Sequence, residues 1–150
     1  MPAATTTRVE QTTPSALNRH IKERMEESVR YHAAHPERIP DRLHALNTEW
    51  DIERTLAANA ASLALAGTLL GAFANRRWLV LPAVVTGFLL QHTIHGWCPP
   101  ALLFRWLGVR TAMEIDRERY ALQALRGDFR AVQSGTDAGR AEAALRAVNT

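Results

Sequence analysis

Two long stretches without charge dominate the pattern of hydrophobic and polar positions. Thr55 to Ala74 contains no Asp, Glu, Lys or Arg, and after Asn75-Arg76-Arg77 a second uncharged stretch runs from Trp78 to Trp97. A helix of this length spans about 30 Å, which is the hydrocarbon thickness of a bilayer. A soluble amphipathic helix carries charged residues on its exposed face. The pattern therefore predicts a transmembrane hairpin, with an apolar pair of helices in a soluble bundle as the alternative.

Shorter patterns precede the first stretch. Residues 1–14 are rich in Thr, Pro and Ala and are predicted to be disordered. A helix is expected from Ser15 to about His35, with apolar residues at every fourth position (Leu17, Ile21, Met25, Val29). This narrow stripe suits packing on other helices, or a helix that lies on a membrane surface. Pro40 suits the first turn of a further helix, which we expect to continue without a break into the first span.

The chain after the second stretch is also predicted to be helical. Cys98-Pro99-Pro100 ends the second span, because proline cannot continue a helix. Residues 101–107 are apolar apart from Arg105, so we expect this segment in the membrane interface with the guanidinium at phosphate depth. Thr111 and Glu114 form a capping-box pattern that predicts a charged helix from Ala112 to Arg126, ended by Gly127.

These patterns together predict an all-α fold, a transmembrane helical hairpin with amphipathic cytoplasmic helices on both flanks. The predicted segments are a disordered N-terminus (1–14), a helical cytoplasmic segment (15–54), the two-span hairpin (55–98), interfacial and cytoplasmic helices (99–130) and a flexible Ala-rich tail (131–150).

Composition alone conceals this organisation. The chain has 150 residues, of which 47% are hydrophobic and 22% charged, and these averages are typical of a soluble protein. The averages exclude a collagen-like or wholly disordered chain. The net charge of +3 is too small to indicate nucleic-acid binding, so no nucleic-acid partner is predicted. A single cysteine excludes an intramolecular disulfide.

Tryptophan and arginine positions indicate how the hairpin would sit in a membrane. Each predicted span has a tryptophan near its ends, where indole rings anchor helices at the interface (Trp50, Trp78, Trp97, Trp106). Six arginines lie close to the spans on the two flanks (Arg38, Arg42, Arg54, Arg105, Arg110, Arg117), against Arg76 and Arg77 in the loop. The positive-inside rule then places both termini in the cytoplasm. Residues 1–16 contain no apolar signal segment, so we expect the first span to act as the insertion signal.

Four polar residues inside the spans form a predicted intramembrane cluster (Asn59, Gln91, His92, His95). In an antiparallel hairpin centred on Arg76, Asn59 is level with position 93, so all four would share one depth in the cytoplasmic half. Intramembrane ionisable residues often have functional roles. Hydrogen bonding between the helices, from His92 or Gln91 to Asn59, is the favoured interpretation of the cluster.

The same region offers possible ligands for a soft metal. His92, His95 and Cys98 follow one another at intervals of three residues. A metal site needs three or four convergent ligands, and Gly96 and Pro99 interrupt the helix near Cys98. The sequence therefore predicts no bound metal and no cofactor. For Cys98, a structural role is favoured over that of a thiol carrier, because no cationic residue adjoins it.

Small residues predict where the helices pack closely. Gly67 and Gly71 form a small-residue pair in the first span, and Ala83 and Gly87 form another in the second. Small side chains let helix backbones approach each other in lipid. The pairs would serve the hairpin itself or a homo-oligomer.

The chain resembles the bacterial YgaP-like inner-membrane proteins, a small two-helix family of mostly unknown function. The resemblance rests on Asn59 and the glycines of the first span, on Asn75-Arg76-Arg77, and on Gly96-Trp97-Cys98-Pro99, and it covers about Trp50 to Arg110. Some members carry a rhodanese domain, which is a sulfurtransferase. The sequence here shows no such domain, and Pro99 and Pro100 lack the backbone amides that a persulfide-binding loop needs.

The sequence therefore predicts a non-enzymatic protein of the bacterial inner membrane that acts as an anchor or interaction subunit. No catalytic motif is found. The expected partners are the lipid bilayer and either a second copy or another membrane protein, because two spans alone bury little surface. The alternative hypothesis is a membrane protein that handles thiols, sulfur or metals through Cys98 with His92 and His95.

Overall fold

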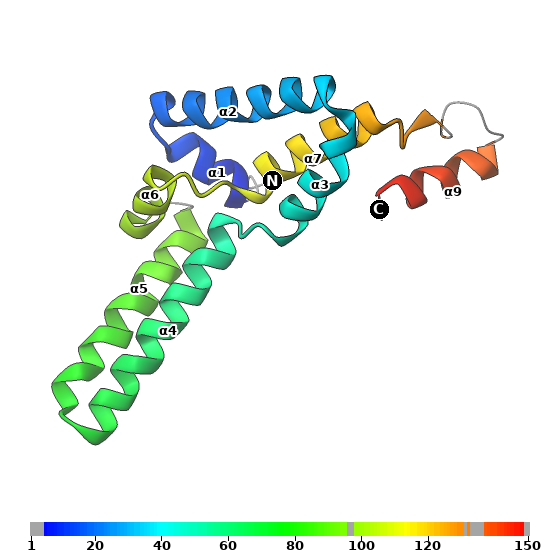
Figure 1. Ribbon diagram of the computed structural model, residues 1–150. Helices are drawn as coiled ribbons and strands as arrows, with labels where there is room; N and C mark the ends of the chain where they lie inside the picture. The colour runs from blue at the N-terminus through cyan, green and yellow to red at the C-terminus, as the bar shows by residue number, and fades with distance from the viewer. Residues whose placement is uncertain (1–4, 96–97, 131, 133–136, 149–150) are drawn as a thin grey trace. The chain divides into compact units, whose positions relative to one another are not determined.

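The computed structural model describes residues 5–95, 98–130, 132 and 137–148 and forms helices without strands in these ranges (Figure 1). The predicted all-α class is confirmed. The α-helices are α1 (Thr5–Thr12), α2 (Ser15–Ala34), α3 (Ile39–Thr48), α4 (Ile52–Phe73), α5 (Val80–His95), α6 (Pro99–Trp106), α7 (Ala112–Arg126) and α9 (Asp137–Val148). Two short 3₁₀ helices, η1 (Pro36–Arg38) and η2 (Arg76–Leu79), precede α3 and α5.

The chain divides into two compact units. The first comprises Met1–Ile21 and Trp50–Glu114, and the second comprises Lys22–Glu49 and Ile115–Thr150. Each unit has its own cluster of buried apolar side chains. The candidate site lies in the first unit.

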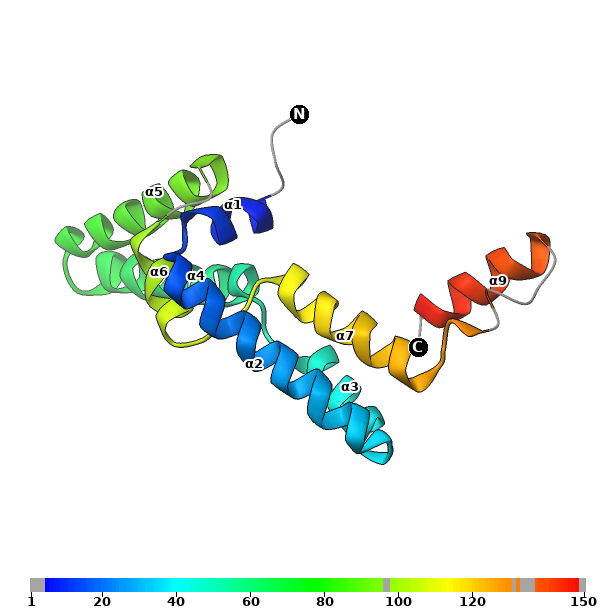
Figure 2. The same cartoon turned by 90° about the horizontal axis from the view of Figure 1, so that it is seen from above.

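Helices α4 and α5 lie side by side along their length (Figures 1 and 2). The last turn of α4 is closed by the amides of Ala74 and Asn75, which both donate to the Leu70 carbonyl. The Asn75 side chain then accepts a hydrogen bond from the Arg77 amide and starts η2. Two stretches of helix, within Pro36–Phe73 and Arg76–His95, are long and apolar enough to cross a membrane, judged by length and composition.

The expectation of a continuous helix into the first span is wrong. The backbone of Glu49 is extended, α3 ends at Thr48, and α4 begins only at Ile52. Asp51 is the N-cap of α4, and its Oδ1 accepts a hydrogen bond from the Arg54 amide at 2.7 Å. Aspartate is among the preferred N-cap residues, so it starts a new helix where neither Pro nor Gly marks a break.

The expectation of a disordered N-terminus also differs from the structure, in which Thr5–Thr12 forms α1. Val9 is 2% exposed and packs in the apolar cluster of the first unit. The Thr13 hydroxyl donates to the Val9 carbonyl at 2.7 Å and closes the end of the helix. A threonine-rich segment has low intrinsic helix propensity, so the tertiary packing of Val9 and the local Thr13 hydrogen bond stabilise the helix instead.

Arg105 does not reach toward a phosphate layer as expected, because it is the largest fully buried side chain of the structure's described part. Its guanidinium donates to both carboxylate oxygens of Glu114, at 2.6 and 2.9 Å. Further donations go to Asn18 Oδ1 at 2.8 Å and to the Thr13 hydroxyl at 3.3 Å. The network therefore ties α6 to the start of α7 and to the N-terminal helices of the same unit.

The predicted capping box at the start of α7 is confirmed. The Thr111 amide donates to Glu114 Oε2 at 2.8 Å, and the Glu114 amide donates to the Thr111 hydroxyl at 3.3 Å. The helix ends at Arg126, and Gly127 follows with a φ of 91°, the left-handed conformation expected of a terminating glycine.

Glu114 makes the stability of the first unit depend on pH. Burial raises the pKa of Glu114, but hydrogen bonds and charge from Arg105 and Thr111 outweigh burial, and the pKa lies below its ordinary value of 4.5. A carboxyl group whose pKa is lower in the folded state stabilises the fold at pH values above its ordinary pKa. This contribution is lost as the pH falls through the lowered pKa. We expect the free energy of unfolding to decrease below about pH 5. Denaturation of wild type and Glu114→Gln, followed by circular dichroism across this range, should give a flatter profile for the variant, and identical slopes would contradict the assignment.

The second unit is organised around α3 and α7. Its apolar cluster joins α3 to α7 through Ile39, Leu43, Leu46, Ile115 and Leu122. Beside this cluster the buried Glu118 accepts two hydrogen bonds from Arg42, at 2.9 and 3.1 Å, and one from Ser28 Oγ at 2.6 Å. The carboxylate is thus compensated by a bidentate arginine, which is the geometry that makes a buried charge tolerable.

Candidate functional site

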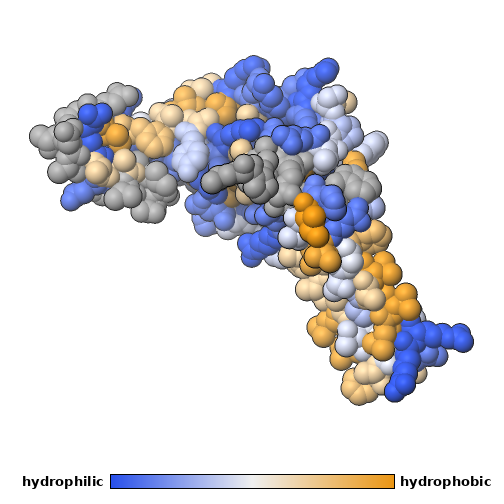
Figure 3. Space-filling model, turned by 180° about the vertical axis from the view of Figure 1, so that it is seen from behind, coloured by the Kyte–Doolittle hydropathy of each residue, from blue (hydrophilic) through white to orange (hydrophobic). Residues whose placement is uncertain are grey.

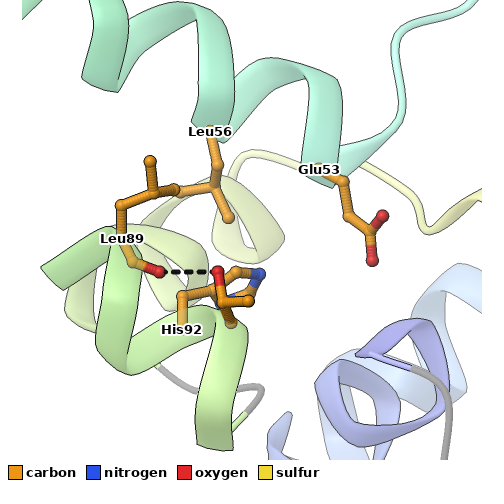
Figure 4. A pocket seen from close by; sticks show the side chains of 5 residues that line it. Glu53, Leu56, Leu89 and His92 are labelled. Atoms are coloured by element: carbon orange, nitrogen blue, oxygen red, sulfur yellow. Dashed lines mark hydrogen bonds between the residues drawn. The ribbon is translucent and has the colours of Figure 1, made fainter. Parts of the chain in front are cut away.

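A cavity of about 240 Å³ lies between the first turns of α4 and the last turns of α5 (Figure 4). Glu53 and Leu56 line it from α4, and Leu89, His92 and Thr93 line it from α5. It brings a carboxylate and an imidazole to one space at the end of the apolar helix pair. This combination makes it the candidate site of the chain.

Glu53 owes its place to the start of α4. The Asp51 cap fixes the first turn, and an acidic residue in that turn is favoured by the positive end of the helix dipole. The Glu53 Oε1 atom is buried and accepts no hydrogen bond from the described residues. Sequence reasoning missed Glu53 because this residue lies two positions before the uncharged stretch, within the predicted cytoplasmic segment 15–54.

His92 is placed by the face of α5 that packs on α4. It is 5% exposed, whereas Thr93, Ile94 and His95 are exposed. The spacing from Leu89 to His92 is one helical turn, so both side chains lie on the same side of α5. Of the four residues in the predicted intramembrane cluster, His92 is the one that lines the cavity.

The other three members of that cluster lie elsewhere. Asn59 is exposed and donates its amide to the Thr55 carbonyl of its own helix at 2.8 Å. Gln91 is half-buried and His95 is exposed, and neither lines the cavity. The expected hydrogen bond between Asn59 and His92 or Gln91 is therefore not formed, and Asn59 bonds within α4 instead.

The register of the helix pair explains this outcome. Gly67 lies against Leu81 and Pro82, and Gly71 lies against Leu79, so the pairing is centred before Arg76. The 3₁₀ helix η2 rises about 2 Å per residue, whereas the α-helix α4 rises about 1.5 Å. Fewer residues after the turn therefore cover the same length as the residues of α4 before it. As a result Asn59 lies nearer to the η2 turn than His92 does, instead of lying level with it.

Cys98 is buried rather than presented at a surface. It is the N-cap residue of α6, is 2% exposed, and packs with Val9, Ile52, Leu56 and Ala101. Burial raises the pKa of the Cys98 thiol, and the nearby Ala101 backbone amide, which lowers this pKa, offsets the effect of burial only in part. Because a thiolate is disfavoured, the surroundings favour a structural cysteine over a thiol carrier.

No group of three or more His, Cys, Asp or Glu side chains in the described parts of the chain is arranged to hold a metal ion. His92 and Cys98 lie against different cavities, and His95 faces outward. The donors of the alternative hypothesis are therefore not brought together.

No family model, curated protein or solved structure matches the chain. The resemblance to YgaP-like proteins thus stays a prediction that rests on the residues quoted for it. Gly96 and Trp97, which belong to its most specific motif, lie outside the described residues.

The two predicted small-residue pairs differ in their surroundings. A Cβ atom at Gly67 would lie 2.6 Å from Pro82 Cδ, and one at Gly71 would lie 2.5 Å from Leu79 Cδ2. These glycines therefore allow the close approach of α4 and α5. Ala83 is exposed, and a Cβ atom at Gly87 would meet nothing within 4 Å. The second pair lies outside this helix contact.

Three of the predicted interface tryptophans are exposed. Trp50 and Trp78 are 49% and 47% exposed, and Trp106 is 74% exposed. The Arg54 guanidinium lies 4.5 Å from the ring centroid of Trp50, which is a cation–π contact. These rings are accessible to a headgroup layer, as an anchoring role would require.

Proposed function

We propose that the chain is a membrane anchor whose α4–α5 pair crosses the bilayer as a hairpin and whose other helices form a cytoplasmic interaction module. The observation that carries the proposal is the apolar outer surface of this pair. In the apolar 18-residue window of each candidate span, only 17% and 6% of the residues are buried. The core helix of a soluble protein of this composition would be mostly buried.

The exposed side chains of the pair are large and apolar. They include Leu65 at 62%, Phe73 at 86%, Val80 at 63%, Leu90 at 62% and Ile94 at 57% exposure. Figure 3 shows orange and pale residues along the pair and blue side chains at its η2 end. Soluble monomers rarely expose an apolar surface of this extent, whereas lipid would cover it at no cost.

The bacterial inner membrane, two spans and cytoplasmic termini are parts of the proposal. They follow from the arginine distribution across the flanks and from the resemblance to YgaP-like proteins. The cytoplasmic module would bind a further protein or a second copy of the chain. No observation favours the thiol- or metal-handling alternative over this anchor.

Topology can be tested with single cysteines in a Cys98→Ser background. We expect Arg77→Cys to react with a membrane-impermeant maleimide from the outer face of the inner membrane, and Glu23→Cys to react only after that membrane is opened. The reason is that the loop carries fewer arginines than the flanks. Alkaline carbonate should leave the chain in the membrane fraction, and its release into the supernatant would contradict the anchor.

A further inference from the structure

A second cavity of about 240 Å³ lies on the first unit, between α4, α5 and the start of α6. It is separate from the Glu53–His92 cavity, although Leu56 and Leu89 border both. Most of its lining is aliphatic or aromatic, with contributions from all three helices (Leu63, Val85, Phe88, Pro100, Leu103, Phe104).

The cavity offers little to a polar ligand. None of the described residues that line it is charged. Asn59 already donates its amide to the Thr55 carbonyl, and Cys98 is 2% exposed. A polar molecule placed here would exchange its hydrogen bonds to water for the few that the Asn59 side-chain amide can offer, which is unfavourable. The chemistry of the walls therefore selects a hydrocarbon.

The cavity is continuous with the apolar outer surface of the helix pair. Leu63, Phe88 and Leu103 line it and are also 49%, 39% and 59% exposed. If α4 and α5 cross a bilayer, the medium at its opening is lipid. We propose that the cavity holds part of one acyl chain of a membrane phospholipid, with α6 as its wall on the headgroup side. The proposal rests on the proposed membrane anchor.

The size of the cavity fits this occupant. An apolar cavity of about 150 Å³ lined by aliphatic and aromatic residues binds benzene. The present cavity is larger at about 240 Å³, and it is open to the outer surface. A segment of a flexible acyl chain can therefore enter it while the rest of the lipid remains in the bilayer.

The test uses the full chain in phosphatidylcholine vesicles that contain a phospholipid with a photoreactive diazirine in one acyl chain. After irradiation, the crosslinked residues are mapped by mass spectrometry. We expect crosslinks to concentrate on Leu63, Phe88 and Leu103 rather than on Leu65 and Leu90, which are exposed but do not line the cavity.

Two variants make the test specific. Ala60→Trp places an indole in the cavity, because Ala60 lines it, whereas Ala83→Trp adds the same group to an exposed part of α5. Crosslinking to Leu103 should fall about tenfold in Ala60→Trp, the change expected from the loss of roughly two buried methylene groups. It should stay unchanged in Ala83→Trp.

Two results would overturn the acyl-chain site while leaving the anchor intact. The first is an even distribution of crosslinks over the outer surface, unaffected by Ala60→Trp. The second is protein–protein crosslinking at the same residues when a photoreactive amino acid replaces Leu103, which would show that a second copy covers the cavity. Release of the chain by carbonate would instead overturn the proposed anchor itself.

Discussion

Replacement of Arg105 by Met should lower the free energy of unfolding by about 3–5 kcal/mol, the range measured when one partner of a buried ion pair is removed. The side chains of Arg105 and Glu114 are 1% and 8% exposed, and the two are joined by two hydrogen bonds. Methionine would fill much of the volume but would leave the Glu114 carboxylate buried without its counter-charge. Thr13 and Asn18 would also lose a donor.

Chemical denaturation followed by circular dichroism in mild detergent measures this loss. The matched control is Arg30→Met, because Arg30 pairs with Glu26 at 3.2 Å with side chains 78% and 42% exposed. An exposed pair contributes at most about 1 kcal/mol, so the control should stay near wild type. The double variant Arg105→Met/Glu114→Leu should recover part of the stability, since no charge is then left buried. Equal losses for Arg105→Met and Arg30→Met would contradict a special role for the buried pair.

The Arg105 network also shows which features the sequence could not predict. An arginine in an apolar segment next to a predicted span favours the membrane interface on local grounds. Its actual partners, Thr13 and Asn18, lie far away in sequence, and nothing in the local pattern connects them to it. Glu114 was recognised, but only for its local hydrogen bonds with Thr111.

Features set by neighbouring residues were predicted more successfully. The capping box at Thr111, the stop at Gly127 and the helix break before Pro99 each depend on residues within one turn. The break at Asp51 was missed because aspartate can either cap a helix or continue one, and the sequence does not decide between them.

The candidate site depended on register, which a pattern of twenty uncharged residues leaves undetermined. The depth of each residue could be estimated only by assuming where the turn is centred. The 3₁₀ geometry of η2 moved that centre, so His92 lines a cavity with Glu53 and Leu56 rather than with Asn59. An error of a few residues in the turn was therefore enough to change the composition of the site.

The glycine at position 67 should be the most sensitive small residue of the helix pair. A Cβ atom there would lie 2.6 Å from Pro82 Cδ and 3.1 Å from Leu81 Cβ, and neither atom can move away by a simple side-chain rotation. Gly67→Leu must therefore push α4 and α5 apart, and overpacking of this kind costs about 1–3 kcal/mol. The expected result is a lower midpoint of thermal unfolding in detergent.

Gly87→Leu is the matched control for this prediction, because a Cβ atom at Gly87 meets nothing within 4 Å. Leucine there would point away from α4. Because leucine favours the helix over glycine by up to about 1 kcal/mol, the midpoint of thermal unfolding should stay the same or rise. The contrast between the two variants isolates the close contact from general effects of adding an apolar side chain to a helix. A similar loss of stability in both variants would contradict the prediction, because it would show that the close contact at Gly67 is not the reason for the loss.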